Sequence, residues 1–150
     1  MAGVAELRAA AEADLGAIRA LLESAGLPTT DLQAAKPSFT LLREHGAIVA
    51  AGALQRFGSA ALLRSLVVAT DRRGTGLGSI IVHELEKVAA AVRIRRLFLL
   101  TPTAREFFTH QGYRVVERSE APQDIQGSEE FRSLCPASAI CMMKVLADSP

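Results

Sequence analysis

The sequence predicts an α/β fold in a single domain that spans residues 1–150. Three β-compatible runs follow one another between Ser38 and Ala69 and are separated by turn signals. The third run leads into a glycine-rich loop and then into the clearest helical pattern of the chain, Gly76 to Val92. A continuous apolar run, Leu97 to Leu100, is typical of a strand buried on both faces. Strand and helix patterns therefore alternate within one chain.

Composition favours one compact domain with a sizeable core. The chain has 150 residues, 49% of them hydrophobic, and a chain of this length buries roughly 70% of its unfolded surface. The formal charge of +1 argues against a nucleic-acid partner, and the basic patch Arg93 to Arg96 is interpreted as a solvated helix end. No signal-peptide pattern or long apolar run occurs, so we expect a cytoplasmic protein without membrane partners.

The first third of the chain predicts a short strand followed by two helices. Val4 to Arg8 is compatible with an edge strand. A helix is expected from Asp14 to the Gly26-Leu27-Pro28 stop, because its apolar residues fall on one face: Leu15, Ile18, Leu21, Leu22 and Ala25. Thr29 to Leu32 is typical of the cap of a second, shorter helix.

The three-strand meander comes next, and the long helix follows its last strand. The predicted strands are Ser38 to Arg43, Ala47 to Arg56 and Ala60 to Ala69. In the helix, the residues Leu77, Ile81, Leu85, Val88 and Val92 recur in steps of three or four.

The last third predicts three further strands and a short helix. The strands are Arg96 to Thr101, Tyr113 to Arg118 and Ala137 to Leu146. Thr103 is expected to cap the helix with Glu106 as its capping-box partner, and Gly112 is expected to end it. The polar stretch from Ser119 to Cys135 is interpreted as a loop containing a short helix.

The loop from Arg72 to Ser79 is the best indication of function. Gly74, Gly76 and Gly78 allow successive backbone N–H groups to point toward one anion at the start of a helix. Two familiar phosphate loops fit poorly, because no lysine follows Gly78 and because Ser79 stands where a dinucleotide fingerprint needs its third glycine.

Two motifs carry a resemblance to a known family. Arg73-x-x-Gly76-x-Gly78 resembles the acetyl-CoA pyrophosphate loop of the GNAT acetyltransferases, and Ala104-x-x-Phe107-Phe108-x-x-x-Gly112-Tyr113 resembles their second motif. The order of strand, loop, helix and strand is also similar over nearly the whole chain. The resemblance implies a GNAT fold: a mixed, mostly antiparallel sheet of six to seven strands, flanked by about four helices and splayed between strands 4 and 5.

The same resemblance implies an acetyl-CoA-dependent N-acetyltransferase in which an amine attacks the thioester directly. In similar enzymes the strand before the loop binds the pantetheine arm and the loop binds the pyrophosphate. The residues implied for acetyl-CoA are Leu66, Val67, Val68, Arg72, Arg73, Gly74, Thr75, Gly76, Leu77, Gly78, Ser79 and Phe107. No metal is expected.

A narrower resemblance concerns the acceptor. Leu62 to Leu66, Leu99 to Ala104 and Leu134 to Ala139 look like amino-acid N-acetyltransferases of arsenic-resistance operons. The implied partner is a small-molecule amine, an amino acid or an amino-acid-like toxin such as a phosphinate or arsinate analogue of glutamate. We hypothesise that Arg64 binds the acidic group of this acceptor, and the alternative is that Arg64 points to solvent or to an internal acid.

The proton-transfer groups are left open by the sequence. In the second motif of the GNAT acetyltransferases, a tyrosine often protonates the departing CoA thiolate, and Phe108 stands at that position here. A thiol pKa lies near ~8.5, so the thiolate is a good leaving group and tolerates the loss of this acid. For the base, one candidate is a water held by Thr101, Thr103 or Ser138. The other is a histidine, of which His45 and His83 are expected on the surface and His110 on the short helix. Tyr113 is expected in the core.

Other functions stay open as alternatives. Cys135 and Cys141 are expected as free buried thiols, although a trivalent arsenical could bind such sulfur ligands. The acidic residues of the 119–135 segment would suit a protein or peptide acceptor: Glu120, Asp124, Glu129 and Glu130. A non-catalytic acetyl-CoA-binding or metalloid-responsive module is the third possibility. The sequence is compatible with a monomer or a homodimer.

Overall fold

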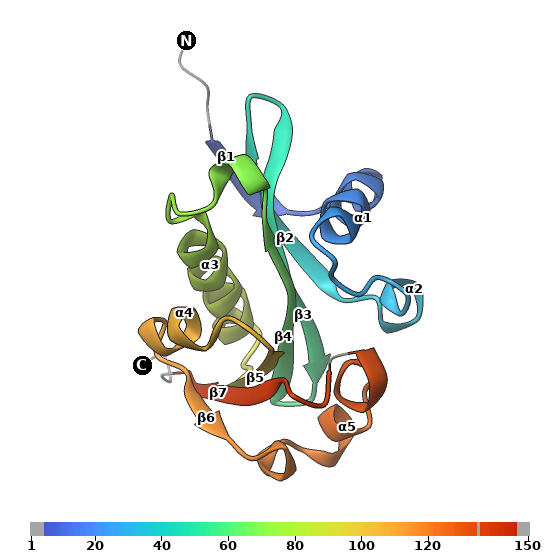
Figure 1. The fold of residues 1–150 in the computed structure, drawn as a ribbon, viewed down its shortest axis with the longest axis vertical. Coiled ribbons are helices and arrows are strands. Elements are labelled where there is room, and N and C mark those ends of the chain that lie inside the picture. The colour runs from blue at the N-terminus through green and yellow to red at the C-terminus, as the bar shows by residue number, and fades with distance from the viewer. Residues whose placement is uncertain (1–4, 135, 147–150) are drawn as a thin grey trace. The chain divides into compact units, whose positions relative to one another are not determined.

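The computed structural model describes residues 5–134 and 136–146. Seven strands of this part of the chain form one mixed sheet in the order β1-β2-β3-β4-β5-β7-β6 (Figure 1). Their bounds are β1 Ala5–Ala9, β2 Ser38–Glu44, β3 Ala47–Phe57, β4 Ala60–Val68, β5 Arg96–Thr101, β6 Arg114–Val116 and β7 Ile140–Val145. The α-helices are α1 Leu15–Ser24, α2 Leu32–Ala35, α3 Leu77–Ala91, α4 Arg105–His110 and α5 Gln123–Gln126. Short helical turns are η1 Glu12–Asp14, η2 Thr70–Arg72, η3 Arg118–Glu120 and the π-helical η4 Glu130–Leu134.

Pairing within the sheet confirms the predicted mixed, mostly antiparallel topology. β1, β2 and β3 pair antiparallel in succession, as do β5 with β7 and β7 with β6. β4 and β5 run parallel, with Ala60 opposite Arg96 and Leu62 opposite Phe98. All seven predicted strands are present, and the largest differences are in the last two, where β6 and β7 are shorter than their predicted ranges.

The chain divides into two compact units. One comprises Met1–Leu54 with Ser65–Leu85, and the other comprises Gln55–Arg64 with Glu86–Pro150. β3, β4 and α3 each continue from one unit into the other. The prediction of a single functional domain over residues 1–150 therefore stays a prediction.

In the first unit, two helices cover opposite faces of the strands (Figure 1). Successive residues of a strand point to opposite faces. Ala51 and Ala53 of β3 belong to a core cluster with Ile18 and Leu22 of α1. Gly52, between them in sequence, faces the side chains of α3. A strand of small residues thus lets α1 and α3 approach the sheet closely.

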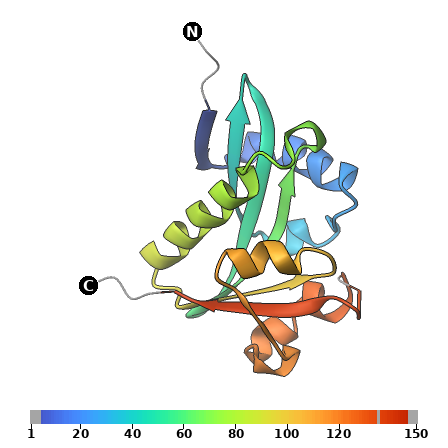
Figure 2. The same cartoon turned by 60° about the vertical axis from the view of Figure 1, so that its left-hand side comes forward.

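In the second unit, the core lies on the face of β5 and β7 that the chain segment after β6 covers. Phe98 and Leu100 of β5 cluster with Ile125 of α5 and Phe131 of η4. α4 lies on the other side of these strands from α5 (Figure 2). The 119–135 segment, predicted as a loop with a short helix, contains α5 as well as η3 and η4.

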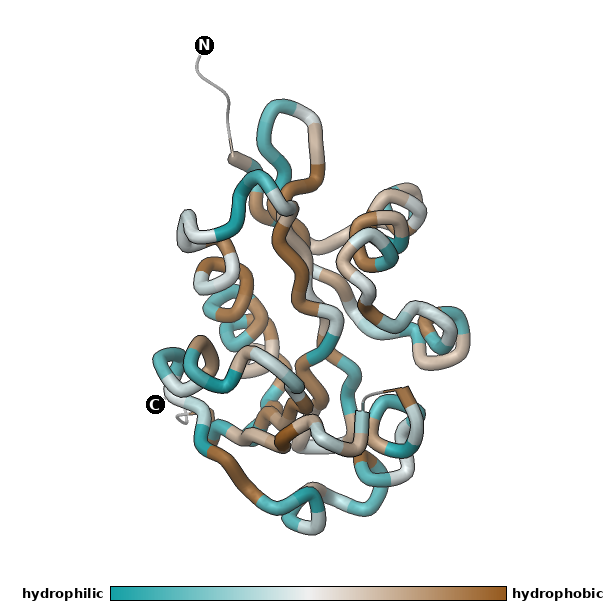
Figure 3. Tube along the Cα trace, in the orientation of Figure 1, coloured by the Kyte–Doolittle hydropathy of each residue, from teal (hydrophilic) through white to brown (hydrophobic). Residues whose placement is uncertain are grey.

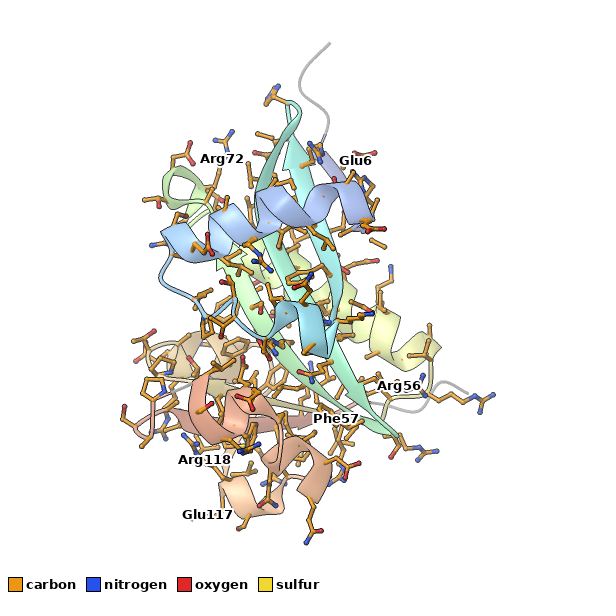
Figure 4. The ribbon with its side chains drawn as sticks, turned by 90° about the vertical axis from the view of Figure 1, so that its right-hand side faces the viewer. Glu6, Arg56, Phe57, Arg72, Glu117 and Arg118 are labelled. Carbon is orange, nitrogen blue, oxygen red and sulfur yellow. The ribbon has the colours of Figure 1, made fainter. Side chains whose placement is uncertain are left out.

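Arg118 fixes the path of the chain between η4 and β7. Its guanidinium donates hydrogen bonds to the carbonyl oxygens of Ala139 at 2.8 Å, Pro136 at 3.1 Å and Phe131 at 3.4 Å. The side chain lies among the helical turns of this segment (Figure 4). One half-buried cation therefore satisfies several backbone acceptors that would otherwise need other partners.

Asp14 joins β1, β2 and the turn before α1. Its carboxylate accepts hydrogen bonds from Arg8 at 2.9 Å, Arg43 at 2.8 Å and the Ala11 N–H at 2.8 Å. The Arg8 hydrogen bond is the largest cause, and the Ala11 N–H the next, of a lowering of the Asp14 pKa to about 2. The ionised form is therefore more stable in the folded than in the unfolded protein.

This lowered pKa predicts a specific pH dependence of stability. The contribution of Asp14 is fully present above its unfolded pKa of about 3.9 and is lost as the pH falls toward the folded value of about 2. Asp14→Asn is expected to lower the midpoint of thermal unfolding at pH 6, and the difference from wild type is expected to shrink between pH 4 and pH 2. Glu12→Gln, an exposed residue in the same turn, is the control. A difference that stays constant down to pH 2 would contradict the prediction.

No helix within the described ranges combines the length and apolar character that crossing a bilayer requires. Within the same ranges, no three His, Cys, Asp or Glu side chains are grouped where they could hold a metal ion.

Candidate acyl-CoA site

The glycine loop lies between the end of β4 and the start of α3. The chain changes there from hydrophobic to hydrophilic residues (Figure 3). Gly74 and Gly76 have positive φ angles, +80° and +87°, a region that glycine adopts without steric cost. The Gly76 carbonyl accepts the N–H of Ile80 at 3.3 Å and so begins the helical hydrogen bonding. Gly78, by contrast, lies inside α3.

Both left-handed glycines border open space. A Cβ built on Gly74 or Gly76 would meet no heavy atom of the described residues within 4 Å. The backbone here is therefore accessible to a ligand, at a helix start, where the first backbone N–H groups have no acceptor within the helix itself. This combination suits the pyrophosphate that the sequence motif predicts.

A cavity of about 280 Å³ lies next to the loop, within the first unit. It is lined by Glu44, His45, Arg72, Thr75 and Leu77. Arg72, labelled in Figure 4, forms an ion pair in which Nε lies 2.8 Å from Oε1 of Glu44, at the tip of the β2–β3 hairpin. The Thr75 hydroxyl donates to the Arg72 carbonyl oxygen. Three residues that the sequence predicts for acetyl-CoA, Arg72, Thr75 and Leu77, thus line one cavity. Glu44 also lines it and is not among the predicted site residues.

The other predicted acetyl-CoA residues lie on β4, on α3 and at the loop. Leu66 and Val68 are partly exposed and alternate with the buried Val67. Arg73 donates from Nε to the Val68 carbonyl oxygen at 3.3 Å. Ser79 is in the first turn of α3. Phe107, on α4, belongs to the second unit.

β4 is irregular just before its predicted pantetheine segment. Its parallel pairing with β5 covers Ala60 to Leu62, although β4 continues to Val68 and β5 continues to Thr101. At Ser65 the backbone φ is +57°, an uncommon conformation for a residue other than glycine. The family resemblance implied a splay between these strands, and their pairing ends at Leu62, shortly before this local distortion of β4.

Arg64, next to this distortion, is buried with an internal acid. Its side chain is fully shielded from solvent, and its Nε lies 3.5 Å from Oε1 of Glu130. Arg64 Nη1 also donates to the Gln55 Oε1 at 3.1 Å. The sequence left open whether Arg64 faces an acceptor, solvent or an internal acid, and in the structure it is paired with the internal acid Glu130. A role for Arg64 in binding the acceptor stays a prediction.

The three hydroxyl residues proposed to hold a catalytic water differ in their surroundings. The Thr101 hydroxyl oxygen is buried and accepts the N–H groups of Ala104 at 2.9 Å and Thr103 at 3.4 Å. Thr103 and Ser138 are exposed. The capping prediction for Thr103 is wrong: the N-cap of α4 is Ala104, which has no side-chain cap, and Thr101 supplies the oxygen to this turn. His45, His83 and His110 are exposed.

The second motif builds an aromatic cluster. Phe108 makes edge-to-face contacts with Phe107 and Tyr113, with ring centroids 5.0 and 5.6 Å apart. Tyr113 is buried, as predicted, and donates its hydroxyl hydrogen to Glu86 Oε2 at 2.9 Å. Burial, followed by the charge of Glu86, raises the pKa of Tyr113 above its usual range. Lys144 completes this group, with its Nζ 2.9 Å from Glu86 Oε1.

Of the two cysteines, Cys141 is a free buried thiol. Burial raises its pKa to about 11, so the thiolate that binds metalloids is disfavoured at neutral pH. Cys135, the other proposed arsenical ligand, lies outside the described residues.

Solved structures share this fold. N-acetylglutamate synthase from Neisseria gonorrhoeae, solved with coenzyme A and N-acetyl-glutamate, superposes with a TM-score of 0.82 at 21% identity, over 96% of this chain and 35% of that chain. A Mycobacterium tuberculosis protein solved in complex with CoA gives a TM-score of 0.80 at 25% identity, over 95% of this chain and 99% of that chain.

Curated relatives are amino-acid acetyltransferases. Those of Ralstonia nicotianae and Mannheimia succiniciproducens are 29% and 26% identical over 89 residues, 58% of this chain. The matched region is 20% of the length of each of these two relatives, so the chain spans only a small part of their length. Residues 35–115 match the acetyltransferase (GNAT) domain. Because this match covers more than half of the sequence, the chain belongs to the GNAT acetyltransferases, an acyltransferase family that uses acetyl-CoA.

Proposed function

We propose that this protein transfers the acetyl group of acetyl-CoA to the amino group of a small molecule, by direct attack of the amine in a ternary complex. The observation that carries the proposal is the strand, open glycine loop and helix start of β4 and α3, within a chain of this family. A catalyst of this type works mainly by holding two reactants in a productive geometry and by removing the proton of the amine. Acetyl-CoA supplies the activated thioester.

The first unit contains all of the residues proposed to hold acetyl-CoA except Phe107. Backbone groups of Leu66 to Val68 would bind the pantetheine arm, and the loop from Arg72 to Ser79 would bind the pyrophosphate. The α3 dipole and the loop N–H groups favour negative charge at this point. Arg72 or Arg73 would add a charge-assisted contact. The site residues fit this ligand because Gly74 and Gly76 leave the backbone uncovered.

We propose an amino acid or an amino-acid-like toxin as the acceptor. The support is the name of the curated relatives, amino-acid acetyltransferase, together with the resemblance to enzymes of arsenic-resistance operons. An acidic acceptor would need a cation, for which Arg64 is the candidate. Since Arg64 is paired with Glu130, the acceptor's acid would have to take the place of that carboxylate.

We propose that a water accepts the proton of the amine and that the departing thiolate leaves without a general acid. Phe108 supplies no hydroxyl, and a thiolate leaves readily without a general acid. A water near Thr101, Thr103 or Ser138 would accept the proton of the amine. Thr101 contributes less to such a relay because its oxygen already accepts two backbone N–H groups.

Two alternatives lead to different acceptors or to none. A protein or peptide acceptor is supported by a structural neighbour described as the ribosomal-protein-S18-alanine N-acetyltransferase from Escherichia coli, with a TM-score of 0.74 at 15% identity. A non-catalytic acetyl-CoA-binding or metalloid-responsive module is supported by the missing tyrosine at Phe108. In each case we propose one cytoplasmic domain over residues 1–150, acting as a monomer or homodimer.

Acetyl-CoA turnover against an acceptor panel tests the proposal. We expect thiol release with one class of acidic amino acids or with phosphinate or arsinate analogues of glutamate, and none with peptides. Release with peptides alone would favour the protein acetyltransferase. Tight binding of acetyl-CoA, measured by calorimetry, without thiol release for any acceptor would favour the binding module.

A further inference from the structure

We propose that Glu130 is a positioning residue for acyl-CoA binding: through Arg64 it holds β4 in the distorted conformation that presents Leu66 to Val68 to the pantetheine arm. This inference rests on the proposed function, because it assumes that these three residues bind acyl-CoA. It assigns a role to a residue that lies far along the chain from the glycine loop.

The distortion of β4 is centred on the backbone of Ser65. A left-handed residue in the middle of a strand is unfavourable for serine, and it persists only where surrounding contacts hold it. Because side chains alternate along a strand, one residue out of register reverses the faces of those that follow. The conformation of Ser65 therefore decides which groups of Leu66 to Val68 are available to a ligand.

The residue before Ser65 makes two contacts with other parts of the second unit. Arg64 is anchored to Glu130 on one side and to Gln55 of β3 on the other. The side chain of Arg64 is fully buried and that of Glu130 is 7% exposed. Each charge therefore compensates the other, because removing one partner of a buried pair leaves an uncompensated charge in the interior. A regular strand at Ser65 would change the direction of the chain at Arg64 and so disturb both contacts.

The segment that carries Glu130 is tied by hydrogen bonds and by core packing. Glu130 begins η4, a π-helical turn, an irregular form that is frequent at functional sites. The Ser128 hydroxyl donates to the Ile125 carbonyl oxygen at 2.6 Å and accepts the Phe131 N–H at 3.3 Å. Phe131 is itself buried in the core of the second unit. Glu130 thus lies between two residues whose contacts fix the path of its backbone.

The test is direct binding of acetyl-CoA by calorimetry, at a temperature where every variant is folded. Glu130→Gln keeps the size of the side chain but removes its charge, and we expect its Kd for acetyl-CoA to rise roughly tenfold, a factor in the range of such local strain. Adding Ser65→Gly should restore the Kd to within roughly threefold of wild type, because glycine adopts positive φ freely. It should not restore the melting temperature. Glu129→Gln, an exposed neighbour in the same segment, should bind like wild type.

Several results would overturn the inference. An unchanged Kd with a lowered melting temperature would make the pair purely structural. A lower acceptor KM with an unchanged Kd would instead indicate that Glu130 competes with the acceptor for Arg64. Failure of Ser65→Gly to restore binding would remove the link to the backbone. If Glu130→Gln is insoluble, Gln55→Leu takes its place with the same expectations. Lack of acetyl-CoA binding by the wild type would refute the proposed function itself.

Discussion

Replacing Gly76 with alanine is expected to weaken acetyl-CoA binding roughly 5- to 30-fold while leaving the protein folded. At φ +87° an L-residue pays about 1–2 kcal/mol relative to its preferred conformations, and this energy corresponds to that range of binding constants. The loop is expected to relax toward negative φ and so to turn its N–H groups away from the phosphate position. Calorimetric titration with acetyl-CoA measures the effect.

Gly58→Ala is the matched control for this prediction. Gly58 also has a positive φ, +66°, and a Cβ there would likewise meet no described heavy atom within 4 Å, but it lies in the turn between β3 and β4. Both variants should lose a similar amount of stability, and only Gly76→Ala should lose affinity. Equal affinities for the two variants would mean that the conformation of the loop does not determine binding.

The sequence allowed the elements to be predicted because their signals are local. Arg96 to Thr101 was predicted with the bounds that β5 has, since an apolar run between polar residues indicates a buried strand. The long helix was placed within one residue at each end, Gly76 to Val92 against Leu77–Ala91, because its apolar residues follow the helical period. The glycine loop was recognised because its motif is likewise contained in a short stretch of sequence.

The features that escaped prediction depend on contacts distant in sequence or on competing local choices. Ser65 gives no sign of its left-handed backbone, because positive φ is ordinarily read from glycine or asparagine. The apolar neighbours of Arg64 indicated that it needs a counter-charge. The sequence could not identify the acid, because Glu130 lies on a different element, far along the chain. Before α4, Thr103 fits the capping pattern, but the helix has no side-chain cap, and the Thr101 hydroxyl oxygen instead accepts the N–H of Ala104.

Gly52→Val is expected to produce a large loss of stability, about 3 kcal/mol, or a fall of roughly 6–12 °C in the melting temperature. A Cβ on this β3 residue would come within 2.8 Å of Ile81 Cγ2, 2.9 Å of Leu85 Cδ1 and 3.3 Å of Leu66 Cδ1. The first two distances are too short for carbon atoms, so α3 must move away from the strand. Gly16→Ala, in α1 with no described heavy atom within 4 Å of its Cβ, should be neutral or slightly stabilising.

A double mutant separates this steric mechanism from a general weakness of β3. Leu85→Ala alone should cost about 2–5 kcal/mol because it leaves a cavity. Combined with Gly52→Val it should cost clearly less than the sum of the two, since valine then occupies the space that the leucine vacated. Additive costs would contradict close packing of α3 on Gly52. Because Leu66 is one of the crowded residues and belongs to the proposed pantetheine segment, Gly52→Val should also weaken acetyl-CoA binding below its melting temperature, and the double mutant should recover part of that affinity.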